Sequence, residues 1–116
     1  MRTSALTHRI AFERRALFDD GYGNKRGEFG LVFEAQAGIQ ARMGGEAVLA
    51  ERLAGRQPVT IRVRQSTGAR EVTTDWRIRD VRTGTLYNIR AITDPFSHTA
   101  ERGRYFDILA ESGVAT

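Results

Sequence analysis

Apolar and polar residues alternate over several short stretches of this chain, which is the pattern of half-buried β-strands. The first stretch covers residues 8–16, and the longest covers residues 33–43. In the longest stretch, the apolar residues of one face are Phe33, Ala35, Ala37, Ile39, Ala41 and Met43. Further stretches cover residues 59–64, 75–81, 86–92 and 105–111. Short alternating strands in this number predict a mainly β fold, a small five- to six-stranded β-barrel.

The spacing of apolar residues changes once, between the second and third of these stretches. Residues 44–56 read GGEAVLAERLAGR, and their apolar side chains recur three and four positions apart, as on one side of a helix. Gly55 suits the end of a helix, and Pro58 cannot continue one. The sequence therefore predicts one short helix between strands two and three.

Three long polar loops connect the predicted elements, at residues 19–29, 65–70 and 93–104. The first reads DDGYGNKRGEF, and it is longer than the about two to five residues that a tight hairpin needs. Loops in excess of what a fold requires are the usual location of binding residues. We therefore interpret the loop 19–29 as an assembly element.

The last predicted strand, residues 105–111, is apolar on both faces. Phe106 and Ile108 share one face, and Tyr105 and Leu109 share the other. A strand of this kind is usually covered on both sides. We expect the second cover to be the helix or a neighbouring subunit.

Composition limits the classes of protein to which the chain can belong. The 116 residues fit one domain, 1–116, and no run of about 18 apolar residues predicts a membrane-spanning helix. The formal net charge is +4, and 17 of the 18 basic side chains are arginines, which pair with carboxylates and stack on aromatic rings at interfaces. Acidic residues interleave with the basic ones, so no block of like charge marks a nucleic-acid-binding tail.

The chain lacks the residue patterns of catalytic and ligand-binding motifs. It has no cysteine, which excludes disulfides, thiolate nucleophiles and cysteine-bearing zinc sites. His8 and His98 lie in different segments, without the spacing of metal ligands. The segment GYGNKRG lacks the G-K-[ST] ending of a phosphate loop, and Asp19 and Asp20 lack the register of a calcium loop. We therefore predict no enzymatic activity, no cofactor and no metal.

Nucleic-acid binding is the alternative function that the residues leave open. Arg62 and Arg64 share one strand face, and Arg77 and Arg79 share another. Small barrels bind single strands with a basic groove and aromatic platforms. The aromatic residues of these strands lie on apolar faces, where we expect them in the core: Phe12, Phe33 and Trp76. The arginine rows can instead form ion pairs between strands or subunits, so a free-standing nucleic-acid-binding barrel stays the second hypothesis.

The order of four segments resembles one known family. These segments are LTHRIAFERRA with DDGYGN, the long alternating strand, GGEAVLAERLAGRQPVTIRVR, and DWRIRDVRTGTLYNIRAI. The chain resembles the phage head–tail joining proteins, also called head closure or stopper proteins, of long-tailed phages, prophages and phage-like gene transfer agents. The resemblance covers the chain from about Leu6 to about Ala110. Family members often carry a tryptophan shortly after the first loop, where this chain has Phe29 and Phe33.

The resemblance implies a small β-barrel whose copies form a homo-oligomeric ring of six or twelve subunits. Such a ring lies below the portal–adaptor complex of a virion or phage-like particle, which is assembled in the bacterial cytoplasm. It closes the DNA exit channel after packaging and provides the surface on which the tail terminator or tail tube docks. A structural connector of this kind has no enzymatic activity and no membrane partner.

Two sets of residues are candidates for these contacts. For the assembly interface in the loop 19–29, we predict Asp19, Asp20, Tyr22, Asn24, Lys25 and Arg26. For non-specific contact with DNA in the channel, we predict Arg42, Arg56, Arg64 and Arg70. The segments 42–57 and 65–74, which carry these arginines, are the candidates for the loop that gates the channel.

Overall fold

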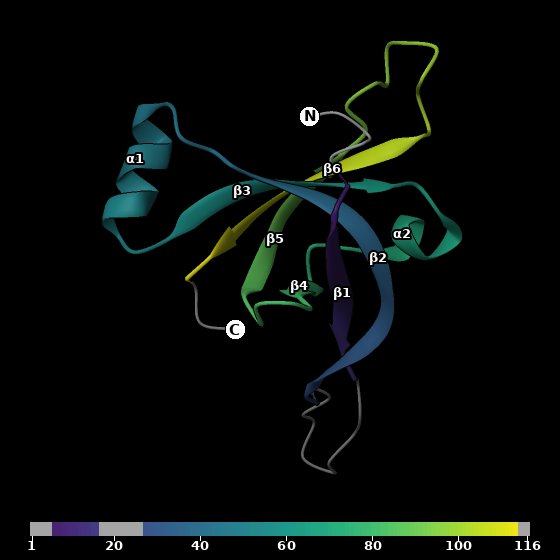
Figure 1. Cartoon of the computed structure of the whole chain (residues 1–116), viewed down its shortest axis with the longest axis horizontal. Helices are drawn as coiled ribbons and strands as arrows, with labels where there is room; N and C mark the ends of the chain where they lie inside the picture. Colours follow the sequence, from purple (N-terminus) through teal and green to yellow (C-terminus); the bar gives the residue numbers. More distant parts are fainter. Residues whose placement is uncertain (1–5, 17–26, 114–116) are drawn as a thin grey trace.

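The alternating stretches form a closed barrel of six antiparallel strands in a computed structural model that describes residues 6–16 and 27–113 (Figure 1). The strands are β1 (His8–Arg15), β2 (Phe29–Ala41), β3 (Gln57–Arg64), β4 (Arg77–Asp80), β5 (Leu86–Thr93) and β6 (Tyr105–Ser112). Their order around the barrel is β1-β2-β3-β6-β5-β4. The predicted mainly β fold with a small barrel is therefore confirmed.

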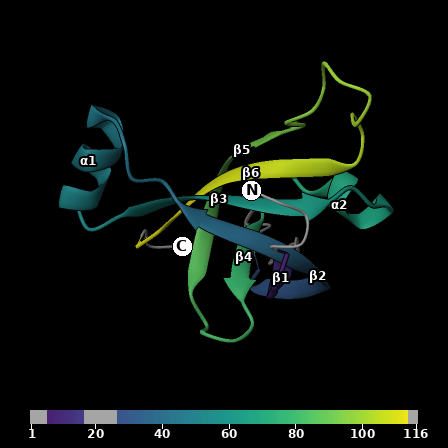
Figure 2. The same ribbon diagram turned by 45° about the horizontal axis from the view of Figure 1, so that its top comes forward.

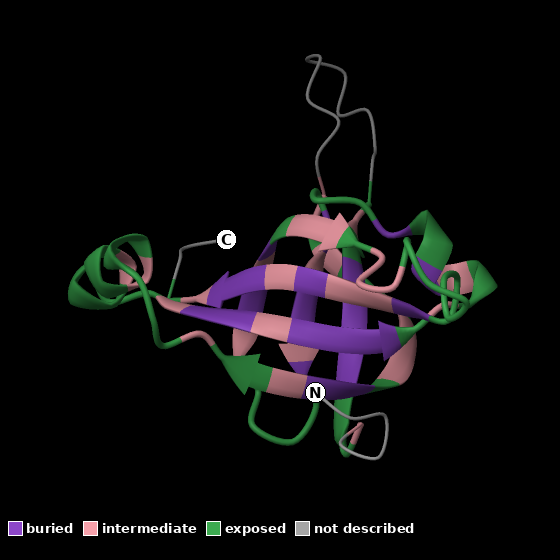
Figure 3. Ribbon diagram, turned by 90° about the horizontal axis from the view of Figure 1, so that it is seen from above, coloured by how far each residue is buried: buried purple, intermediate pink, exposed green. Residues whose placement is uncertain are grey.

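The inward side chains of the strands form one apolar core, and most of the strand residues are buried or half-buried (Figure 3). Burial alternates in β4, whereas β1 and β3 contain runs of four and three buried residues. The largest side chains with almost no exposed surface are Phe12, Ile10, Ile61, Ile78 and Ile108. Phe12 stacks on Phe33 with 4.6 Å between ring centroids, and Trp76 meets Phe33 edge-on at 6.5 Å. Phe12 and Trp76 are therefore buried in the core as predicted, and Phe33 packs against it partly buried. Full burial of a phenylalanine stabilises a fold by about 1.5–3 kcal/mol.

The predicted helix between strands two and three is α1 (Glu46–Leu53), but it does not cover the barrel. None of its residues is buried, and Leu49 and Leu53 are 54% and 80% exposed. Figures 2 and 3 show α1 standing away from the strands. Residues 43–56, which we call the arm, thus extend from the barrel, and the predicted alternation over 33–43 ends at Ala41, with Met43 outside the strand and exposed.

A second helix, α2 (Thr67–Glu71), occupies the predicted polar loop 65–70, so the prediction of a single helix is wrong. The Ser66 hydroxyl accepts a hydrogen bond from the N–H of Ala69 at 3.0 Å and caps the helix. Ala69 and Val72 are buried, and Gly68 lies against the ring of Phe33. A helix of five residues is too short to show an apolar period, so the sequence pattern missed it.

The predicted loop 19–29 ends one residue too late, because Phe29 already begins β2. The hairpin ladder of β1 and β2 extends further still, since the N–H of Ala16 donates to the carbonyl oxygen of Glu28 at 3.2 Å. The residues 19–26 of this loop lie outside the described part of the chain.

The second face of β6 has a different cover from the one predicted. Phe106 and Ile108 face the core, while Tyr105, on the outer face, is only 6% exposed. The ring of Phe96, from the loop between β5 and β6, meets Tyr105 edge-on at 6.1 Å. A loop of the same chain therefore covers the Tyr105 end of β6, where the helix was expected, and the cover by a neighbouring subunit stays a prediction for the half-buried Leu109.

The end of β6 meets the arm at two glycines. Gly113 and Gly55 both have positive φ, 85° and 84°, a conformation that favours glycine. A methyl group added at Gly113 would collide with the carbonyl group of Gly55. The arm is therefore joined to the barrel through a close approach of two backbones.

We expect Gly113→Ala to lower the free energy of unfolding more than Gly84→Ala does. Gly84 also has positive φ, 77°, so both variants bear the cost of a left-handed alanine, about 1–2 kcal/mol. Only at Gly113 does the methyl group also meet backbone, since nothing lies within 4 Å of it at Gly84. Urea denaturation measures the difference, and equal losses would contradict the close approach.

Candidate assembly surfaces

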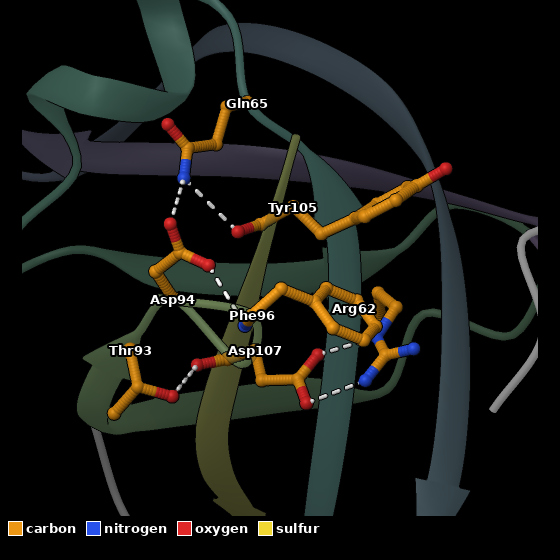
Figure 4. A network of polar contacts seen from close by, with 7 residues as sticks. All are labelled: Arg62, Gln65, Thr93, Asp94, Phe96, Tyr105 and Asp107. Atoms are coloured by element: carbon orange, nitrogen blue, oxygen red, sulfur yellow. Dashed lines mark hydrogen bonds and ion pairs between the residues drawn. The ribbon is translucent and has the colours of Figure 1, made fainter. Parts of the chain in front are cut away.

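The outer face of the barrel is held together by ion pairs between neighbouring strands. The clearest joins β3 to β6, whose register places Arg62 opposite Asp107. The guanidinium donates from Nε to Oδ1 at 2.7 Å and from Nη2 to Oδ2 at 2.9 Å (Figure 4). The two side chains are 10% and 17% exposed, so this bidentate pair is largely withdrawn from water. The hydrogen bonds that Arg62 donates to Asp107 raise the pKa of Arg62, which stays charged.

The same region anchors the loop between β5 and β6, residues 94–104. The Asp94 carboxylate accepts hydrogen bonds from the N–H groups of Gly103 and Phe96 at 2.8 and 2.9 Å, and from Gln65 Nε2 at 3.3 Å. The bonds from Gly103 and then Phe96 hold the pKa of Asp94 below its ordinary value of 3.8. Arg62 stacks over the ring of Phe96 at 5.1 Å. One carboxylate therefore binds both ends of this loop, and Figure 4 shows its contacts with Phe96 and Gln65.

A second anchored region joins β1 to β4. Glu13 is 6% exposed, and it accepts hydrogen bonds from Arg77 Nε at 2.7 Å and Arg79 Nε at 3.1 Å. Burial raises the pKa of Glu13, but the bonds from Arg77 and Arg79 outweigh burial and hold that pKa below its ordinary value of 4.5. Arg77 and Arg15 also lie over the ring of Phe29, at 4.2 and 4.5 Å. This cluster forms a firm base below the first loop.

These contacts bear directly on the nucleic-acid hypothesis. The two predicted arginine rows do lie on outer strand faces, but Arg62 is paired with Asp107, and both Arg77 and Arg79 are paired with Glu13. Arg64 lies over the ring of Tyr105 at 5.8 Å. The aromatic residues that would stack on bases are in the core. The arginine rows therefore stabilise the barrel, and they form no free track for phosphates.

The four channel candidates form two separate pairs. Arg42 and Arg56 flank α1, whereas Arg64 ends β3 and Arg70 lies within α2. The two helices lie at opposite ends of the long axis of the molecule, which measures 48 Å (Figure 1). The structure therefore does not bring the four arginines together within one subunit.

The predicted interface residues of the first loop cannot be placed. Asp19, Asp20, Tyr22, Asn24, Lys25 and Arg26 all lie outside the described residues. The structure describes only the base of this loop, at Ala16, Gly27 and Phe29.

The histidines and carboxylates of the described residues, 6–16 and 27–113, form no cluster of three or more that is typical of a metal site. Neither α1 nor α2, the helices of this described part, has the length and apolar character needed to cross a membrane. His8 and His98 are both exposed.

Comparison with known proteins identifies the family. The sequence profile of the phage head completion proteins matches residues 1–113. The chain belongs to this family. Head completion proteins are structural components of the virion. The predictions of a non-enzymatic structural protein and of a virion location are therefore confirmed for the family. No curated protein matches the chain significantly.

Two solved structures share the fold of this head completion protein. One is a chain in the virion of a native gene transfer agent particle, with a TM-score of 0.66 and 23% identity over 94% of this chain and 96% of that one. The other is the solution structure of protein SF1141 from Shigella flexneri 2a, with a TM-score of 0.69 and 21% identity over the full length of both chains. At these identities the likeness supports the barrel fold.

Sequence reasoning missed two features of these surfaces. Asp94 and Gln65 lie 29 positions apart, and they meet only because β6 pairs with β3 on one side and with β5 on the other. The signal for the anchored loop was the pair Asp94–Pro95, because aspartate commonly bonds to the backbone two residues later. The exposure of Leu49 and Leu53 had no sequence signal, since their helical spacing is that of a buried face.

We expect Asp107→Ala to destabilise the protein by about 3 kcal/mol, because it removes both hydrogen bonds of a largely buried ion pair. The matched control is Glu34→Ala. It removes an ion pair whose Arg9 side chain is 54% exposed, and it should cost less than about 1 kcal/mol. Urea denaturation of both variants measures the free energies of unfolding, and similar losses would contradict the buried character of the first pair.

We expect stability to fall as the pH drops below 4.5, partly through Glu13. Its folded pKa lies below the ordinary value of 4.5, so its stabilising contribution is complete above that pH. This contribution is lost as the pH falls through the folded pKa. The urea midpoint measured at a series of pH values should therefore decline less steeply in Glu13→Gln than in the wild type, and an unchanged slope would exclude this role.

Proposed function

We propose that this head completion protein forms a ring below the portal–adaptor complex, closes the DNA exit channel and presents the surface on which the tail docks. The observation that carries the proposal is the arm, which leaves a firmly anchored barrel without burying any residue of its helix. A ring subunit needs both parts: a rigid body to set its position, and a segment that acquires its packing from neighbours. Six and twelve copies both agree with such a ring.

The arm is the part best suited to act as the gate. Gly44 and Gly45 precede its helix and Gly55 follows it, so both ends can change direction. Its exposed apolar residues are Met43, Leu49 and Leu53. Two buried polar atoms, Arg42 Nε and Glu51 Oε2, have no hydrogen-bond partner in the part of the chain that the structure describes. Buried groups are normally paired, so the arm and the adjoining Arg42 have the features of a segment completed by a neighbouring chain.

The arginines beside the arm supply the proposed contact with DNA. If the arm faces the channel, Arg42 and Arg56 recur in every subunit and form a positive belt around the duplex. Arg64 and Arg70 then lie at the far end of each subunit, away from the channel. The segment 42–57 is accordingly our first choice for the gate, ahead of the segment 65–74.

The contacts above and below the ring are assigned to the first loop. Its base is held by the pair of arginines around Phe29, so the barrel would present Asp19, Asp20, Tyr22, Asn24, Lys25 and Arg26 from a firm support. Mixed charges and a tyrosine suit a contact with a portal–adaptor or tail protein.

We expect particles that carry Arg42→Glu with Arg56→Glu to lose packaged DNA while retaining the protein. The two changes replace attraction to phosphates with repulsion in every subunit, and the defect should grow at low salt, where repulsion is least screened. Nuclease sensitivity of the DNA in purified tailless heads measures the loss. Electrophoresis of the same particles reports whether the protein is present.

The control is Arg82→Glu with Arg102→Glu, which makes the same change in charge at exposed positions away from the arm. These particles should retain their DNA. If particles with Arg64→Glu and Arg70→Glu leak DNA instead, the α2 end of the subunit faces the channel. Normal retention in all three variants would exclude an arginine belt.

A further inference from the structure

Most of the large apolar side chains that are exposed in the described part of the chain lie in two groups, one at each end of β2. One group belongs to the arm, beyond the last residue of the strand: Met43, Leu49 and Leu53. The other lies near the start of the strand: Leu31 and Val32. β2 has 13 residues, roughly 40 Å of extended chain. Figure 1 shows α1 far from the start of β2, so the arm does not cover the second group in its own subunit.

The exposed side of α1 is apolar with an acidic margin. Leu49 and Leu53 are four positions apart, so they share one side of the helix, and Glu51 on the opposite side is half-buried. Glu46 is exposed and precedes Leu49 by three positions, so its carboxylate borders the apolar side. Arg52 lies further round the helix from this side than Glu46 does. We call the surface of Leu49, Leu53 and Glu46 the arm face.

The start of β2 presents an apolar surface with a basic margin. The register of β1 and β2 places Leu31 opposite Glu13 and Phe29 opposite Arg15, so these side chains share the outer face. Arg15 lies over the ring of the half-buried Phe29 at 4.5 Å. Glu13 is buried beneath its two arginine partners, whereas Arg15 has no ion pair among the residues described. We call the surface of Phe29, Leu31 and Arg15 the β2 face.

The arm face and the β2 face complement each other. Both are apolar at the centre, and packing one against the other removes their side chains from water. One has an acidic margin and the other a basic margin, so opposite charges also come together. Glu28 does not reverse this sign, because it directly precedes Phe29 and alternation turns it to the other side of the strand. Two β2 faces, in contrast, would bring like charges together.

We propose that the arm face of one subunit packs on the β2 face of a second copy of this chain. The apolar side chains of the two faces cover one another, and Glu46 of one copy pairs with Arg15 of the next. The chain itself supplies both halves of the contact, and a contact between two different surfaces of one chain is the kind that closes into a ring. This contact rests on the proposed ring, whose subunits it joins. It leaves Arg42 and Arg56, which flank α1, available to the channel.

Engineered cysteines test the contact, because the chain has no cysteine of its own. Leu31→Cys and Leu53→Cys are combined in one chain, and purified particles that carry it are mildly oxidised. We expect a ladder of disulfide-linked multimers beyond the dimer on electrophoresis without reducing agent, because each copy then has a partner at both faces. Either single variant should give no multimer. Reduction before electrophoresis measures the protein in the particles, and multimers are expressed as a fraction of it.

The matched control combines Leu53→Cys with Val81→Cys. Val81 is also exposed, but it follows β4 and lies outside the β2 face. Because a disulfide forms only between Cβ atoms about 4 Å apart, this pair should give at least about fivefold less multimer.

Charge reversal in the double-cysteine chain tests the two margins. Glu46→Arg alone and Arg15→Glu alone should each lower the yield of multimers at least about threefold, because each places like charges in the contact. The two reversals together should restore most of the yield, since the charges are again opposite. A purely structural effect of either substitution would not be rescued by the other.

Several results would overturn the contact. One is the absence of multimers from the double-cysteine particles, and another is an equal ladder from the control pair. Dimers from Leu53→Cys alone would pair α1 with a second α1 instead, and a yield that the double reversal does not restore would exclude the pair of Glu46 and Arg15. DNA leakage from Arg42→Glu with Arg56→Glu in the absence of a ladder would uphold the proposed gate and reject this contact alone.

Discussion

Closure of the barrel depends on its shortest strand. β4 has only four residues, yet it is the link between β1 and β5. On the inner face Ile78 is completely buried, and on the outer face Arg77 and Arg79 both donate to Glu13. Backbone pairing over four residues would hold such a strand weakly, so a buried side chain and a doubly bonded carboxylate keep it in place. Opening this seam would expose two strand edges and the core behind them.

The firmness of the barrel contrasts with the elements around it. Ion pairs between strands and the carboxylate of Asp94 hold the outer face and the loop 94–104. The arm buries no helical residue, and the first half of β2 lacks a strand on one side. A small domain has enough apolar residues for one core, and here that core lies inside the barrel. The arm and the first half of β2 are therefore left for other chains to cover. This division suits a protein of the particle that sets its position by a rigid body and completes its packing on assembly.

Parts of the candidate site could be predicted from the sequence, and others could not. Alternation placed Arg62, Arg77 and Arg79 on outer faces, because side chains of a strand alternate strictly. It could not show that their partners are Asp107 and Glu13, since strand register decides which residues meet. The order of short motifs indicated the phage head–tail family, and the match to the head completion family confirms the assignment at that level.

The sequence by itself determined the class of fold, the number of strands to within one, and the position of the first helix, because these follow from local periodicity. Only the tertiary structure decided that this helix leaves the barrel, that α2 occupies a predicted loop, and that the loop 94–104 covers Tyr105. The spacing of apolar residues in a helix is the same whether the helix packs against its own chain or against another chain. Where each element packs depends on strand pairing between distant residues, and local patterns do not contain that information.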